Sequence, residues 1–130
     1  MTLDGIIRFF HLLAAAVWIG GLFVLGSIAA NLRRSGAGPD QMRAMARGYG
    51  RLAWPTLVIS VVTGFWQADR LATDMGSGAM LTKLLLVFVV VALAGIHQAT
   101  ARRSSPAVRG MLQGLILLVS LAILAAAVTL

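Results

Sequence analysis

Residues 79–101 read AMLTKLLLVFVVVALAGIHQATA. An α-helix needs about 20 consecutive, mostly apolar residues to cross the hydrocarbon core of a bilayer. This stretch is long enough, and Lys83 and His97 are its only ionisable side chains. It therefore predicts a transmembrane helix. Three more segments of the same character lie at about residues 5–31, 50–72 and 108–130.

The composition of the whole chain is typical of a membrane protein. Of its 130 residues, 59% are hydrophobic and 12% are charged, whereas soluble domains average about 45–50% apolar and about 25% charged residues. The chain has no cysteine, which excludes disulfides, iron–sulfur clusters and thiolate metal sites. We expect an all-α fold, a single integral membrane four-helix bundle over residues 1–130.

The basic residues lie mainly in two connections between the expected spans. These are Arg33, Arg34, Arg43, Arg47 and Arg51 in the first connection, and Arg102, Arg103 and Arg109 in the third. The positive-inside rule places both connections on the cytoplasmic side, with the N-terminus, the middle connection and the C-terminus outside. The net charge of +7 is thereby explained by topology, and no binding to nucleic acid is expected. The first span exceeds the length of a signal-peptide core and is followed by arginines, so it is not expected to be a cleaved leader.

The first connection also has a helical pattern. Asp40 follows Pro39, where it can cap a short helix. Arg43, Arg47 and Arg51 recur every four residues and so share one helix face. We expect an interfacial helix that contacts the phosphates of membrane lipid.

Gly110 and Gly114 form a Gly-x-x-x-Gly pair at the start of the fourth span. Such a pair allows two helices to approach closely. The approach is expected either within the subunit or between the subunits of a homo-oligomer.

Four ionisable side chains inside the spans are candidates for a functional site, because such residues are costly in a membrane. By helix rise, His11 lies roughly 9 Å from the outer end of its span, with Arg8 one turn above it, and Lys83 lies roughly 6 Å deep. These three are expected in one layer near the outer surface. His97 lies roughly 18 Å deeper than His11, so the two histidines cannot ligate one haem or one metal ion.

Histidine is a ligand of haem iron and of copper. For a b-type haem, His11 would be the axial ligand, and Lys83 would be the second ligand or, with Arg8, a partner of the propionates. Trp18, seven residues after His11, would line the flat ring. The copper alternative uses His11 with Met75 and Met80 near the outer mouth.

Each of these residues also has a structural interpretation. Arg8 and Lys83 can extend their charges to the membrane surface. His11 can form a hydrogen bond between helices, Trp18 can pack between them, and His97 can be structural. A protein in which all of this holds would be a membrane subunit without a cofactor.

The strings of the spans resemble two related families. HLLAAAVWIGGLF, from His11 to Phe23, resembles the first-helix motif of CopD-like membrane domains and a similar segment of the HemJ-type family. RLAWPTLVISVVTGFW, from Arg51 to Trp66, is similar to the second helix of both. LTKLLLVFVVVALAGIH, with Lys83 near its start, resembles their third helix.

The two families imply different functions in a bacterial-type inner membrane. HemJ-type proteins are four-helix haem proteins that oxidise protoporphyrinogen IX, and their essential histidine and lysine would correspond to His11 and Lys83. CopD-like proteins are associated with copper resistance or uptake, and only His11 would carry over. The chain departs from the HemJ-type pattern at Ala30-Asn31 and after Arg109.

The sequence therefore favours a membrane haem or tetrapyrrole protein with a redox role, which would pass electrons between a substrate in the outer layer and an acceptor such as quinone. A copper carrier and a cofactor-free subunit remain the alternatives. Hydrolytic chemistry is poorly supported, because no acidic residue lies well inside a span.

Overall fold

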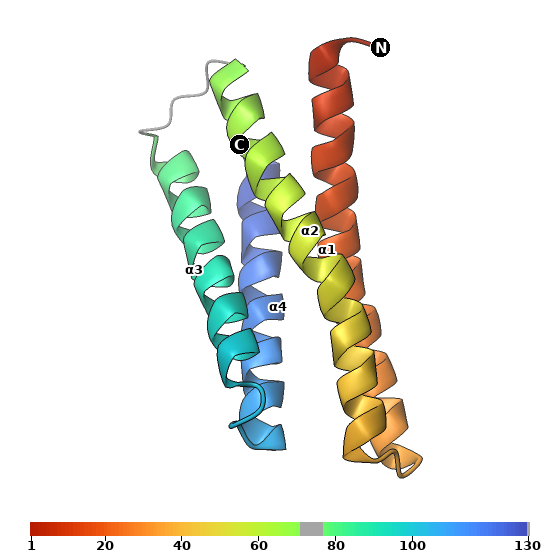
Figure 1. The fold of residues 1–130 in the computed structure, drawn as a ribbon. Coiled ribbons are helices and arrows are strands. Elements are labelled where there is room, and N and C mark those ends of the chain that lie inside the picture. The colour runs from red at the N-terminus through yellow and green to blue at the C-terminus, as the bar shows by residue number, and fades with distance from the viewer. Residues whose placement is uncertain (71–76, 130) are drawn as a thin grey trace. The chain divides into compact units, whose positions relative to one another are not determined.

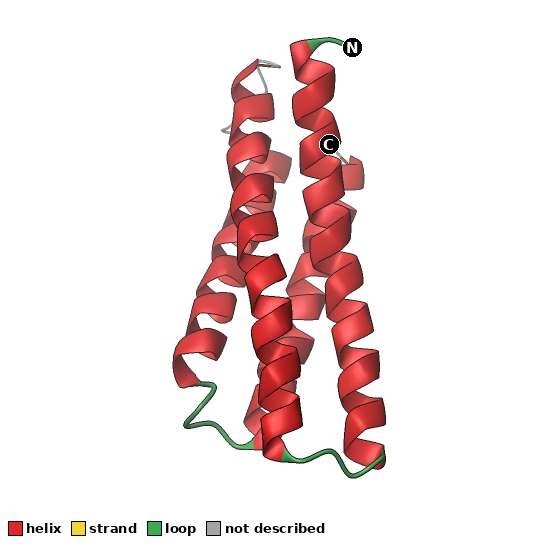
Figure 2. Cartoon of the chain, turned by 45° about the vertical axis from the view of Figure 1, so that its right-hand side comes forward, coloured by secondary structure: helices red, strands yellow, loops and turns green. Residues whose placement is uncertain are grey.

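The computed structural model describes residues 1–70 and 77–129, apart from the side chains of residues 70, 79 and 129. Within these residues the chain forms four α-helices, α1 (Leu3–Arg34), α2 (Pro39–Arg70), α3 (Gly78–Thr100) and α4 (Pro106–Thr129) (Figures 1 and 2). The predicted all-α class and the number of helices are confirmed. The helix bounds agree with the predicted segments except for α2, which begins at Pro39 rather than near residue 50.

The chain divides into two compact units, Met1–Thr73 and Asp74–Leu130. In the first unit α1 packs against α2, and in the second α3 packs against α4. Each pair runs antiparallel around a short connection (Figure 1). We call these units the N-terminal hairpin and the C-terminal hairpin.

α2 is one continuous helix, so the expected separate interfacial helix is instead its first part. Residues 40–47 consist largely of Gln, Met, Arg and Ala, which are good helix formers. The helix also continues through Pro55. Asp40 lies in the first turn rather than before it, and the Gln41 side chain accepts a hydrogen bond of 2.6 Å from the Gly38 backbone N–H.

The N-terminal hairpin has a narrow core of small and apolar side chains. Ala14, Trp18 and Leu22 form a buried stripe on α1, and Ala53 and Leu57 are buried on α2. At one point the helices approach closely, because a Cβ built on Gly21 would lie 3.0 Å from Cε2 of Tyr49. This contact fixes the register of the two helices.

The C-terminal hairpin buries Val90 and Ala94 of α3 and Ile116 and Ser120 of α4. The Ser120 hydroxyl donates to the carbonyl of Ile116 at 2.7 Å, which satisfies a buried polar group within its own helix.

Both glycines of the α4 pair, Gly110 and Gly114, have free space beside them. No atom of the described residues lies within 4 Å of a Cβ built on Gly110 or Gly114. Within the C-terminal hairpin the pair therefore makes no close contact with the described part of α3, and an approach by a second copy stays a prediction.

Three stretches are long and apolar enough to cross a membrane: Leu3–Arg34, Met80–Thr100 and Pro106–Val128. α2 is not among the candidates found in the described residues. Its first part carries arginines, and its second part includes polar side chains such as Thr56, Ser60 and Thr63. As described below, the Thr63 hydroxyl and the backbone carbonyl of Ser60 lie within hydrogen-bond distance of a histidine.

Candidate functional site

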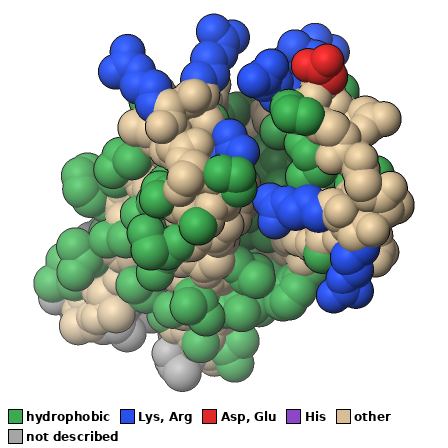
Figure 3. Space-filling view, turned by 90° about the horizontal axis from the view of Figure 1, so that it is seen from below, with side chains coloured by type: hydrophobic (Ala, Val, Ile, Leu, Met, Phe, Trp, Pro, Cys, Tyr) green, Lys and Arg blue, Asp and Glu red, His purple; other side chains and the backbone are tan. Residues whose placement is uncertain are grey.

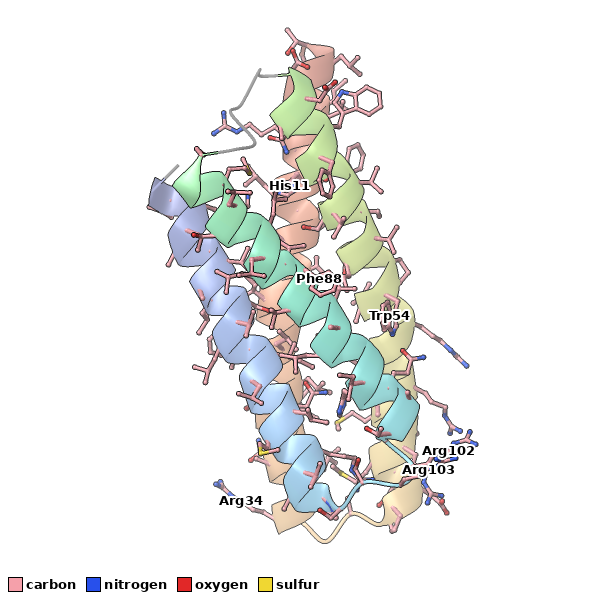
Figure 4. The ribbon with its side chains drawn as sticks, turned by 90° about the vertical axis from the view of Figure 1, so that its left-hand side faces the viewer. His11, Arg34, Trp54, Phe88, Arg102 and Arg103 are labelled. Atoms are coloured by element: carbon pink, nitrogen blue, oxygen red, sulfur yellow. The ribbon has the colours of Figure 1, made fainter. Side chains whose placement is uncertain are left out.

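His11 lies near the start of α1 and is half-buried. Figure 4 shows it far from Arg34, which stands at the opposite end of the same helix. Its ring nitrogen Nδ1 is 2.9 Å from the backbone oxygen of Ser60 and 3.1 Å from the hydroxyl oxygen of Thr63. Both partners belong to α2, so the pairing joins the two helices of the N-terminal hairpin.

The two partners determine which ring nitrogen carries the proton. The Ser60 carbonyl oxygen can only accept, and the Thr63 hydroxyl donates its hydrogen to the carbonyl of Ile59. Nδ1 must therefore be protonated and donate, and in the neutral ring the lone pair is on Nε2. Metal-ligating histidines almost always donate their other N–H in this way to a carbonyl or carboxylate.

Gly64 provides the room for this ring. A Cβ built on Gly64 would lie 3.1 Å from Cε1 of His11 and 3.6 Å from Nδ1. The first distance is tighter than an ordinary van der Waals contact. A Cβ at position 64 would therefore require the imidazole to shift by a few tenths of an ångström.

Sequence reasoning missed Ser60 as a partner of His11, and it noted Thr63 and Gly64 only as letters of the family resemblance. Ser60, Thr63 and Gly64 are the small or polar residues of the run S-V-V-T-G, which lies in an otherwise apolar segment. That run was a usable signal, because small and hydroxyl residues are enriched where membrane helices meet. Their pairing with His11 could not be predicted without the register of α1 on α2.

The other predicted residues of the N-terminal hairpin have different surroundings. Trp18 is 8% exposed and lies on the buried stripe of α1, seven residues after His11, so it shares the histidine's side of the helix. Arg8, one turn before His11, is exposed. The burial of Trp18 is that of a packing residue. The exposed side chain of Arg8 is accessible to an acidic group.

Lys83 and Met80 belong to α3, in the C-terminal hairpin. Lys83 is half-buried and Met80 is 7% exposed. Met75, the third residue of the copper alternative, lies outside the described residues. In the parts of the chain that the structure describes, no three His, Cys, Asp or Glu side chains are grouped so that they could hold a metal ion.

His97 forms a second polar cluster, inside the C-terminal hairpin. Its Nε2 is 2.9 Å from the side-chain nitrogen of Gln113 on α4. Its Nδ1 is buried and has no hydrogen-bond partner among the described residues. One turn before Gln113, Arg109 donates to the carbonyl of Ala101 at 3.0 Å. These contacts tie the end of α3 to the start of α4.

The residues around His11 fit one axial ligand of a tetrapyrrole. With Nδ1 donating, Nε2 is the ring nitrogen that could coordinate a metal, Ser60 and Thr63 hold the ring, and Gly64 makes the space in which it sits. A soft copper site would need thioether ligands beside the histidine; Met80 of that alternative and Lys83 of the haem alternative both belong to α3 of the other hairpin. Compared with known proteins, the chain matches no family model, no curated protein and no solved structure.

Proposed function

We propose that the chain is an integral membrane protein of a bacterial-type inner membrane, with both basic connections on the cytoplasmic side. Three helices of sufficient length and hydropathy support this proposal. Large apolar side chains face outward along the helices, among them Phe88 at 71% and Leu118 at 64% exposure. In a bilayer these side chains would contact lipid, where exposure of apolar surface carries no penalty.

We further propose that His11 is an axial ligand of a b-type haem or a related tetrapyrrole with a redox role. The hydrogen bond from Nδ1 of His11 to the Ser60 carbonyl carries this proposal, because it fixes the tautomer in which Nε2 can coordinate. When bound, a haem would supply one-electron redox chemistry. The candidate substrates are a tetrapyrrole such as protoporphyrinogen IX and, as electron acceptor, a quinone.

The protein residues would bind, orient and tune that group. Ser60 and Thr63 accept from Nδ1–H, which raises the electron density on the imidazole and strengthens its basicity as a ligand. Arg8 and Lys83 are the candidates for holding the propionates, and Lys83 is also the candidate second ligand. Trp18 would give the site an apolar, water-excluding side.

The decisive experiment is an optical spectrum of the detergent-purified protein, oxidised and then reduced, with metal analysis of the same sample. A Soret band with α and β bands after reduction is the expected result. His11→Ala should abolish these bands. His97→Ala is the matched control, because His97 pairs with Gln113 in the other hairpin, and it should retain them.

Three outcomes separate the alternatives. Full haem content in His11→Ala would refute His11 as the ligand. Stoichiometric copper without haem bands would favour the copper site of His11, Met75 and Met80. A protein with neither group after cofactor-replete expression would be the cofactor-free membrane subunit.

A further inference from the structure

The register of the N-terminal hairpin brings two different surfaces to the same end of it. Gly21 of α1 faces Tyr49 of α2. Because the helices are antiparallel, residues 21–32 of α1 run beside residues 39–49 of α2. These two segments adjoin the connection at Ser35 and Gly36, where Gly36 has a φ of 81° that glycine adopts without strain.

On α1 this end of the hairpin is apolar and exposed. Phe23, Val24 and Ile28 are 53%, 57% and 45% exposed. No charged residue lies between Arg8 and Arg33. Ser27 and Asn31 are its exposed polar side chains, and the surface carries no formal charge.

On α2 the same end is cationic. Arg43, Arg47 and Arg51 are all exposed and recur at one-turn spacing. Asp40 is the only acidic residue between Asp4 and Asp69 in the sequence, and its carboxylate lies 3.7 Å from the Arg43 guanidinium. We call the three arginines the arginine face. Figure 3 shows exposed Lys and Arg side chains on the surface seen from the end at which α1 joins α2.

In a hairpin inserted in a membrane, the lengths of the helices would put this end at the membrane surface. α1 and α2 each have 32 residues, which corresponds to about 48 Å, whereas the hydrocarbon core of a bilayer is about 30 Å thick. The uncharged part of α2, residues 52–68, spans only about 26 Å. The arginine face begins where that part ends.

We propose that the arginine face binds the phosphates of anionic phospholipids at the membrane surface, with the hairpin tilted so that Phe23, Val24 and Ile28 on the α1 side lie deeper, among the acyl chains. Guanidinium groups pair with phosphate in a bidentate geometry, and one apolar side opposite one basic side is the signature of an interfacial element. The proposal rests on the membrane insertion proposed above and is independent of the haem.

A pair of spin labels tests the two-sided environment. The chain has no cysteine, so single-cysteine variants are labelled uniquely. Val24→Cys and Ala46→Cys lie three residues from the Gly21–Tyr49 contact on either helix, are thus level along the hairpin, and are both exposed. In nanodiscs, the label at 24 should be accessible to oxygen and the label at 46 to a water-soluble nickel chelate. Equal accessibility of the two labels would overturn the proposal.

A charge experiment tests the lipid. The melting temperature of the wild-type protein should be higher in nanodiscs containing phosphatidylglycerol than in nanodiscs of pure phosphatidylcholine. Arg47→Gln/Arg51→Gln should lose more than half of that difference. Arg102→Gln/Arg103→Gln removes the same charge from the other hairpin and should retain it.

Equal losses in the two double variants would overturn the proposal, as would full stabilisation by inorganic phosphate in neutral nanodiscs. Release of the wild-type chain from membranes by alkaline carbonate would refute membrane insertion itself, and this proposal with it. Absence of haem with an intact lipid effect would refute only the haem function.

Discussion

The two hairpins each hold one histidine between their helices, but they hold it differently. Nδ1 of His11 has two oxygen acceptors from α2, and Gly64 makes room for the ring. His97 has one nitrogen paired with Gln113, while the other is buried without a partner among the described residues. The first arrangement fixes one tautomer of the ring, whereas the second leaves one ring nitrogen without a described hydrogen-bond partner. The role proposed for His11 is coordination, and the role proposed for His97 is structural.

The largest effect should come from filling the space beside His11. Gly64→Val would put side-chain atoms where a Cβ alone already lies 3.1 Å from Cε1. We expect at least a tenfold loss of haem occupancy and a destabilisation of about 1–3 kcal/mol, typical of overpacking. Haem content and thermal unfolding in detergent measure the two effects.

Gly50→Val is the matched control, since no described atom lies within 4 Å of a Cβ on Gly50 of the same helix. Similar loss of haem in both variants would show that any valine in α2 disturbs the site. The special role assigned to Gly64 would then be wrong.

The next largest effect is on protein stability, through the packing of α1 against α2. Gly21→Ala places a Cβ 3.0 Å from Cε2 of Tyr49, so the Tyr49 ring must shift within its packed site, at an expected cost of about 1–2 kcal/mol. Gly20→Ala, one position earlier, meets no described atom within 4 Å and should be neutral or slightly stabilising. Unfolding of both variants in the same detergent makes the comparison, and equal stabilities would contradict the assigned register.

A smaller effect is expected in the C-terminal hairpin. Gln113→Leu leaves Nε2 of His97 buried without its partner and should destabilise the protein by roughly 0.5–1 kcal/mol. His97→Leu removes both ring nitrogens, including the unpaired Nδ1, and should be neutral or stabilising. Thermal unfolding reports the difference in sign, and haem content should be unchanged in both. A larger loss for His97→Leu than for Gln113→Leu would reverse this account of the pair.

The number of helices could be predicted from the sequence, but the helix faces that pack against one another could not. Long apolar runs such as residues 79–101 predict a helix by length alone. The fourth segment was predicted to begin at about residue 108, and α4 begins two residues earlier, at Pro106. The start of α2 was misjudged, because Gly48 and Gly50 next to several arginines resemble the edge of a span, whereas good helix formers continue the helix outward to Pro39.

The candidate site shows the same limit. His11 stood out in the sequence because ionisable residues are rare in spans. Ser60 and Gly64 are ordinary in a membrane helix, and their role depends on which face of α2 meets α1. That choice is made by side-chain packing, such as Tyr49 on Gly21, which no periodicity of a single segment reveals.

The smallest expected effect is the most direct test of how His11 differs from His97, because it changes a single hydrogen bond of the His11 ring. Thr63→Val keeps the shape of the side chain and removes one of the two acceptors of Nδ1–H, leaving the Ser60 carbonyl. A less electron-rich imidazole stabilises a bound ferric ion less, so the midpoint potential of the haem should rise while haem content is retained. Thr56→Val is the control, since the Thr56 hydroxyl donates to the carbonyl of Ala53 within its own helix.

Nitrogen-15 NMR of the His11 ring in haem-free protein tests the cause directly. The wild type should show the Nδ1–H tautomer, and a ring protonated on Nε2 instead would contradict the assignment whether or not haem binds.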